Sequence, residues 1–121
     1  MGARVLVADD SGTMRKIIIR ALNALGISEI TEAADGEQAL QLFGQGTFDL
    51  VLTDWNMPHR TGLEVLEGIR AAGSQVPVVM ITTEAEKRRV LDAIRAGVSD
   101  YLIKPFDPEA LREKIGKFCL A

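Results

Sequence analysis

The sequence predicts an α/β fold, a doubly wound (βα)5 unit built on a parallel five-stranded sheet. Two observations predict it. Short apolar runs alternate five times with segments of helical periodicity, and this alternation is typical of βαβ units. The chain has 121 residues, of which 47% are apolar and 26% are charged, a composition that suits one globular domain. We therefore expect residues 1–121 to form a single domain without linkers or repeats.

The five expected strands are short runs that end at polar residues. They span Arg4–Ala8, Glu29–Ala33, Leu50–Thr53, Val78–Thr82 and Asp100–Ile103. The second run is the most polar and offers only Ile30, Ala33 and the following Ala34 for burial. It therefore has the composition of an edge strand.

The expected helices begin and end at residues that favour helix boundaries. Glycines are expected to end the first four, at Gly26, Gly44, Gly73 and Gly97. The fourth helix carries Val90, Leu91 and Ile94 as its apolar residues. The last helix is expected to begin with Asp107 as N-cap and Pro108 at its first helical position.

Composition excludes several classes of function. Asp and Glu outnumber Lys and Arg by 17 to 14, and the chain has no basic block, which argues against nucleic acid as the main ligand. No apolar run approaches a membrane span, and no signal peptide is visible. Cys119 is the single cysteine and cannot form an internal disulfide, which suits a reducing compartment. We expect a cytoplasmic, monomeric protein.

Chemically active side chains follow the apolar runs, at the point where each strand ends. They are Asp9, Asp10, Asp54, Thr82 and Lys104. Because parallel strands have their carboxyl ends at one edge of the sheet, these groups are expected to meet there, where open α/β sheets place their ligands. Three acids, one hydroxyl and one amine suit a divalent metal ion and a phosphoryl group.

Each of these residues also has an ordinary structural interpretation. Asp9 and Asp10 could form a polar turn, and Asp54 could be a helix cap. As a functional site, the three clustered carboxylates would repel one another, and Mg²⁺ would relieve that repulsion. Asp54 could then accept a phosphoryl group as an acyl phosphate, with Thr82 as hydrogen-bond donor and Lys104 as point charge. The Lys104–Pro105 bond is a candidate for the cis form.

Four segments resemble the receiver domain of two-component response regulators, in particular the stand-alone chemotaxis regulators of CheY type. They are VLVADDSGTMRK, DLVLTDWNMP, VPVVMITTEA and DYLIKPF, and the resemblance covers essentially all 121 residues. It implies a flavodoxin-like sheet with strand order 2-1-3-4-5, an order known for such proteins and not worked out from the spacing.

The resemblance also implies roles for individual residues. Asp54 would be the phosphorylated residue, and Mg²⁺ would bind Asp9, Asp10, Asp54 and the carbonyl of Asn56. Thr82 and Tyr101 would form the switch, with Lys104 as the lysine of the site. Asn56 and Glu84 would steer the water that hydrolyses the acyl phosphate. We expect only weak self-catalysed phosphorylation and autodephosphorylation, so the protein is not expected to be an enzyme.

Two residues depart from the family pattern. Thr61 stands before Gly62 where an Asp is usual, which removes a charge from the loop. Thr83 stands where Ala or Gly is usual and is expected to crowd the phosphoryl position. Three other features have ordinary interpretations. His59 is expected in an exposed loop, and Trp55 near the mouth of the site rather than in the core. Residues 87–89 are expected on a solvated helix face, although they could equally help a partner dock beside Tyr101.

The resemblance further implies partners: a histidine kinase, a separate output protein such as a flagellar motor switch, and a phosphatase. A phosphorelay role unrelated to motility is an alternative. A haloacid-dehalogenase-like phosphatase is another, but Asn56 stands where that class has a second acid. A flavodoxin-like FMN carrier is a third, although Asp9 and Asp10 would repel the FMN phosphate.

Overall fold

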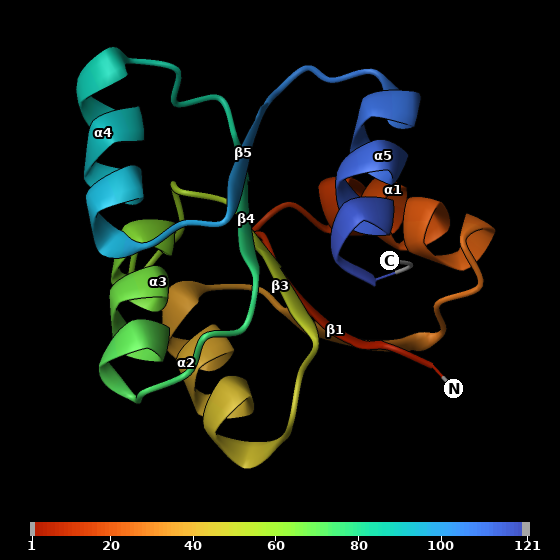
Figure 1. The fold of residues 1–121 in the computed structure, drawn as a ribbon, viewed down its shortest axis with the longest axis horizontal. Helices are drawn as coiled ribbons and strands as arrows, with labels where there is room; N and C mark the ends of the chain where they lie inside the picture. The colour runs from red at the N-terminus through yellow and green to blue at the C-terminus, as the bar shows by residue number, and fades with distance from the viewer. Residues whose placement is uncertain (1, 120–121) are drawn as a thin grey trace.

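The computed structural model describes residues 2–119, which form a five-stranded sheet between two layers of helices (Figure 1). The strands are β1 Arg4–Ala8, β2 Glu29–Ala33, β3 Leu50–Thr53, β4 Val78–Thr82 and β5 Asp100–Ile103. All neighbouring pairs are parallel, in the order β2-β1-β3-β4-β5. The predicted strand bounds and order are confirmed, and β2 is an edge strand as expected. The expected burial of Ala34 is wrong, because the strand ends at Ala33 and Ala34 is exposed.

The helices are α1 Gly12–Ala24, α2 Gly36–Gln45, α3 Gly62–Ala71, α4 Lys87–Ala96 and α5 Pro108–Cys119. Helices α1 and α5 lie together on one face of the sheet, and α2, α3 and α4 follow one another on the other face (Figure 1). The backbone N–H of Glu109 donates to the carboxylate of Asp107 at 2.9 Å. The expected start of the last helix is therefore supported.

Three of the four predicted glycine stops lie at or just beyond a helix end. Gly26, Gly73 and Gly97 all have positive φ angles, between 83° and 95°, that favour glycine. The predicted stop at Gly44 is wrong, because α2 continues through Gln45 and Gly46 is the cap residue. A glycine inside a helix costs only about 1 kcal/mol relative to alanine, so the packing of α2 against its neighbours can outweigh it.

Alternation along the central strands divides the core between the two faces of the sheet. In β1, Val5 and Val7 pack in the layer beneath α1 and α5, and Leu6 and Ala8 pack in the layer beneath α2 and α3. All four side chains are at most 1% exposed. Burial on both faces explains why β1 is a continuous apolar run.

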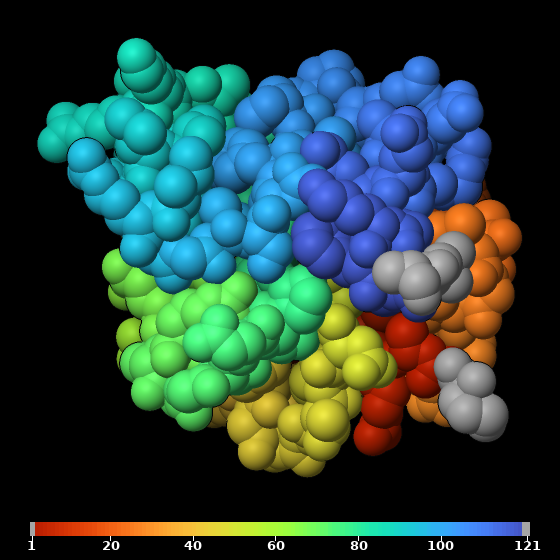
Figure 2. All heavy atoms as spheres, viewed as in Figure 1, coloured from red at the N-terminus to blue at the C-terminus, as the bar shows by residue number. Residues whose placement is uncertain are grey.

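Helix α4 buries less of its apolar surface than the other helices. Ala93 is its only buried residue, whereas Leu91 is 38% and Ile94 is 58% exposed. Figure 2 shows the side chains of α4 standing out at one corner of the molecule. Among the described residues, no helix is long and apolar enough to cross a bilayer.

Candidate functional site

The carboxyl edge of the sheet brings three predicted acids together. Asp9 follows β1 and Asp54 follows β3, and these strands pair directly, with Ala8 opposite Thr53. One oxygen each from Asp9, Asp10 and Asp54 lies within 4.8 Å of the others. Such a group of hard oxygen donors fits Mg²⁺, which binds through a few carboxylates and retains waters.

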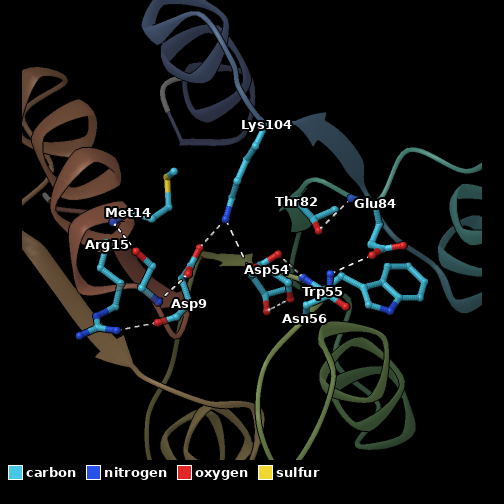
Figure 3. A network of polar contacts seen from close by, with 11 residues as sticks. Asp9, Met14, Arg15, Asp54, Trp55, Asn56, Thr82, Glu84 and Lys104 are labelled. Carbon is cyan, nitrogen blue, oxygen red and sulfur yellow. Dashed lines mark hydrogen bonds and ion pairs between the residues drawn. The ribbon is translucent and has the colours of Figure 1, made fainter.

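Lys104 joins the acids from β5 (Figure 3). Its Nζ lies 2.9 Å from Oδ2 of Asp9 and 3.3 Å from Oδ2 of Asp54. The lysine side chain is only 12% exposed, and the side chain of Asp9 is 1% exposed. The Lys104–Pro105 peptide bond is cis, as the sequence suggested. Three carboxylates against one ammonium leave the site with an excess of negative charge that a divalent cation would offset.

The turn after β1 fixes Asp9 in place. Its Oδ1 accepts a hydrogen bond from the backbone N–H of Ser11 at 2.9 Å, and its carbonyl accepts one from Arg15 at 2.6 Å. Ser11 also caps α1 by accepting from the N–H of Met14 (Figure 3). Asp10 is exposed, in contrast to Asp9, so its carboxylate faces the solvent side of the cluster.

Asp54 is held by its own loop. Its Oδ1 accepts from the backbone N–H of Trp55 at 2.7 Å, and its backbone N–H donates to Ala8 in β1 at 2.9 Å. Its side chain is 11% exposed, whereas that of Asp9 is 1% exposed. Gly62 passes so close that a Cβ there would lie 1.9 Å from the carbonyl oxygen of Asp54. Only glycine fits at that position.

The remaining polar residues of the predicted site come from the end of β4 and from the loops after β3 and β4. Thr82 is fully buried, and its Oγ1 accepts from the N–H of Glu84 at 3.2 Å. Nδ2 of Asn56 donates to Oε2 of Glu84 at 2.8 Å, which joins this loop to the loop after β3 (Figure 3). Thr83 is exposed between Thr82 and Glu84.

Tyr101 reaches the same loop from β5. Its hydroxyl donates to the carbonyl of Glu84 at 2.6 Å. Burial, together with the negative charges of Glu84 and Asp54, raises the pKa of Tyr101 to about 12, against an opposing effect of Arg89. The phenol is therefore neutral at physiological pH and acts as a hydrogen-bond donor.

The predicted locations of His59 and of residues 87–89 are correct, and that of Trp55 is wrong. The side chain of His59 is 68% exposed in its loop, and residues 87–89 lie on the exposed face of α4, both as expected. Trp55 is only 1% exposed and packs against Met80 and Ala93, so it belongs to the core and not to the mouth of the site. The reason is tertiary, since α4 covers the end of β3 there.

Thr61, which stands where an Asp is usual in the family, has a structural role. It is the N-cap of α3, and it forms a capping box with Glu64 in which each side chain accepts from the other residue's backbone N–H. Sequence reasoning missed Arg15 and Arg89, which contact Asp9 and Glu84 respectively. Their spacing from these acids follows no motif that could have identified them.

Comparisons with known proteins agree with this geometry. The family model of the response regulator receiver domain matches residues 5–116. The chain is 43% identical over 116 residues to the chemotaxis protein CheY of Pseudomonas aeruginosa, with 94% of each chain covered. It is also 43% identical to CheY-3 of Vibrio cholerae, covering 94% of this chain and 89% of that one.

Solved structures show the same architecture. The chemotaxis response regulator CheY4 of Vibrio cholerae superposes with a TM-score of 0.89 at 32% identity, covering 98% of this chain and 99% of that one. A putative response regulator from Chloroflexus aurantiacus reaches 0.90 at 26% identity, with all of both chains covered. Sequence and structure therefore agree that the chain belongs to the response regulator receiver family, is of CheY type, and serves phosphorylation-dependent signalling.

Proposed function

We propose that this protein is a signalling switch that accepts a phosphoryl group on Asp54 from a histidine kinase and then changes its affinity for a separate output protein. The observation that carries the proposal is the position of Asp54. Its carboxylate lies 3.3 Å from the ammonium group of Lys104 and clusters with the carboxylates of Asp9 and Asp10, and its side chain keeps 11% of its surface exposed.

Phosphoryl transfer would proceed by direct displacement. A carboxylate oxygen of Asp54 forms the new bond to phosphorus while the bond from phosphorus to the kinase histidine breaks, and that electron pair remains on the imidazole. Lys104 already contacts Oδ2 of Asp54 and would stabilise the charge of the transferred oxygens. Asp9, Asp10, Asp54 and the carbonyl of Asn56 would hold Mg²⁺, which supplies further charge neutralisation at the phosphoryl group.

The response would pass through Thr82 and Tyr101. The hydroxyl of Thr82 can donate to a phosphoryl oxygen, and Tyr101 already contacts the loop that Thr82 begins. Movement of this loop would change α4, β5 and α5, where Leu91, Ile94 and Ile103 are exposed apolar residues. A partner that prefers one arrangement would shift the population towards it.

A chemotaxis output is supported by the names of the similar Pseudomonas and Vibrio proteins. The flagellar motor switch as target and a phosphatase as terminator are further parts of this proposal. A phosphorelay intermediate unrelated to motility is the alternative. Binding of the motor switch protein with and without beryllofluoride distinguishes them. Binding that beryllofluoride leaves unchanged would favour the phosphorelay role.

The central test is labelling of the intact protein with acetyl phosphate, followed by mass spectrometry. We expect a mass gain that requires Mg²⁺, is abolished by EDTA and is absent in Asp54→Asn. An aspartyl-phosphate phosphatase would in addition turn over phosphomonoesters, whereas we expect no turnover beyond the slow loss of the protein's own phosphoryl group. Full labelling of Asp54→Asn would refute the assignment.

A further inference from the structure

The first turn of α4 carries three basic residues that the helix itself does not favour. Lys87, Arg88 and Arg89 occupy its first three positions, the first turn contains no acid, and the cap residue Glu86 makes no side-chain capping bond. The N-terminus of a helix is its positive end, so cations there are unfavourable. If one of these basic side chains has a fixed orientation, contacts with residues outside the helix must stabilise it.

Arg89 is held in this way by two contacts outside its helix. Its guanidinium carbon lies 5.5 Å from the ring centroid of Trp55. Its Nε lies 3.8 Å from Oε1 of Glu84. The pair with Glu84 would stabilise little by itself, because both side chains are partly exposed. The buried indole adds a cation–π contact, and the two contacts together hold the guanidinium in one direction.

These contacts complete a chain of side chains around the phosphoacceptor. Arg89 approaches one carboxylate oxygen of Glu84, and Asn56 donates to the other at 2.8 Å. One end of the chain is Trp55, the residue after Asp54. The other end is Asn56, one residue further on. Glu84 is therefore fixed from both sides, and Arg89 also offsets its negative charge beside the site.

We propose that Arg89 is a positioning residue for gain and loss of the phosphoryl group, acting through Glu84. This inference rests on the proposed phosphorylation of Asp54. In hydrolysis, a water oxygen bonds to phosphorus as the bond to the Asp54 oxygen breaks, and that electron pair returns to the carboxylate. The hydrogen-bonded side chains of Asn56 and Glu84 lie beside Asp54, and on this proposal they guide this water. Without Arg89, Glu84 loses one of its two contacts, and its charge stands uncompensated near the phosphoryl oxygens. Both effects slow the reaction.

The test compares Arg89→Met with Arg88→Met. Both variants remove one positive charge from the same exposed turn, and both relieve the unfavourable interaction with the helix dipole, so neither is expected to impair folding. Labelling by acetyl phosphate with Mg²⁺, and subsequent loss of the label, are measured for each. We expect Arg89→Met to slow both steps severalfold and Arg88→Met to leave them unchanged.

A double-mutant cycle with Glu84→Gln separates positioning from a general structural effect. Because Arg89 acts through the charge of Glu84, Arg89→Met should have little further effect in the Glu84→Gln background. Fluorescence of Trp55, the single tryptophan, provides an independent readout without donor or metal. Its emission should change in Arg89→Met and not in Arg88→Met, since only Arg89 covers the indole.

The outcomes are distinct. If Arg89→Met gains and loses the phosphoryl group at the wild-type rate or faster, the positioning role is overturned. It is also overturned if Arg89→Met slows these steps equally in the wild-type and Glu84→Gln backgrounds. Wild-type protein that accepts no phosphoryl group contradicts the proposed function itself, and the role of Arg89 falls with it. Slowing of Arg89→Met that disappears in the Glu84→Gln background establishes the role.

Discussion

Gly62 decides how closely the loop after β3 can approach Asp54. Its N–H donates to the carbonyl of Trp55 at 2.8 Å, and a Cβ would collide with the Asp54 backbone. The backbone that carries the proposed phosphoacceptor is therefore fixed by the absence of a side chain eight residues later. A rigid support of this kind keeps the carboxylate in one orientation.

Alanine substitution at two glycines tests this argument. Gly62→Ala should lower the free energy of unfolding by about 1–3 kcal/mol or more, because the new methyl group overlaps backbone atoms. Gly44→Ala is the matched control: a Cβ there meets no atom within 4 Å, and alanine favours helix α2 by about 0.5–1 kcal/mol. Urea denaturation measures both, and equal effects would contradict the steric account.

Thr83 should limit the lifetime of the phosphoryl group. Its exposed side chain follows Thr82 at the rim of the site and adds bulk where Ala is usual in the family. Steric crowding acts on the transition state for water attack, and each ~1.4 kcal/mol changes the rate tenfold. Thr83→Ala is expected to speed autodephosphorylation severalfold without changing metal affinity. Unaltered or slower loss of label would remove Thr83 from this role.

At the scale of elements, Asp100 ties β5 to α5. Its carboxylate accepts from Nζ of Lys114 at 3.0 and 3.1 Å and from Lys117 at 3.2 Å. Burial alone would raise the pKa of Asp100. The N–H of Tyr101 and the two lysines outweigh burial, and the pKa is lowered overall. The ionised carboxylate therefore stabilises the packing of α5 against β5, next to Tyr101.

The lowered pKa predicts how stability depends on pH. Because the carboxyl is more acidic in the folded state, its contribution is present above its unfolded pKa and is lost as the pH falls through the folded pKa. Asp100→Asn should reduce the free energy of unfolding by about 1 kcal/mol at pH ~7, and the difference should vanish in acid. Urea denaturation across pH, with Asp92→Asn as charge control, measures it. A difference independent of pH would contradict the ion-pair origin.

Tyr101 connects β5 to the loop that leads into α4. If the hydroxyl of Thr82 turns towards a phosphoryl group, its bond from Glu84 is lost and the loop that Tyr101 contacts must rearrange. We expect the NMR signals of the Tyr101 ring to shift on addition of beryllofluoride and Mg²⁺. Thr82→Ala should abolish this shift. A ring environment that stays the same in wild type would exclude Tyr101 from the switch.

At the scale of the whole molecule, the acid cluster should couple metal binding to stability. Asp9, Asp10 and Asp54 lie together only in the folded chain, so Mg²⁺ should bind the native state preferentially and raise its stability by mass action. At 100 times the dissociation constant the gain is about 2.7 kcal/mol. Thermal denaturation with Mg²⁺ and with EDTA measures it.

Asp10→Ala separates charge repulsion from metal binding. Removal of the exposed acid should raise the stability of the metal-free protein, because fewer like charges meet at the sheet edge. The same change should weaken the stabilisation by Mg²⁺. A wild-type melting temperature indifferent to millimolar Mg²⁺ would argue against a shared acidic site.

The sequence by itself determined the strands, their bounds and the residues that gather at the sheet edge. These follow from local patterns, since each short run between helical segments is a strand, apolar in all but β2, and the residue after it lies at the carboxyl end. In a parallel sheet those ends lie along one edge, so the sequence alone predicts that Asp9, Asp54 and Lys104 gather there, in agreement with their contacts.

Only the tertiary structure decided where several side chains point and what they contact. Trp55 is buried because α4 covers it, whereas Leu91 and Ile94 are exposed because α4 packs mainly through Ala93. The contact of Arg89 with Glu84 and Trp55 likewise depends on how a helix and two loops meet. Periodicity predicts which face of an element is apolar, but packing between elements decides which part of that face is covered.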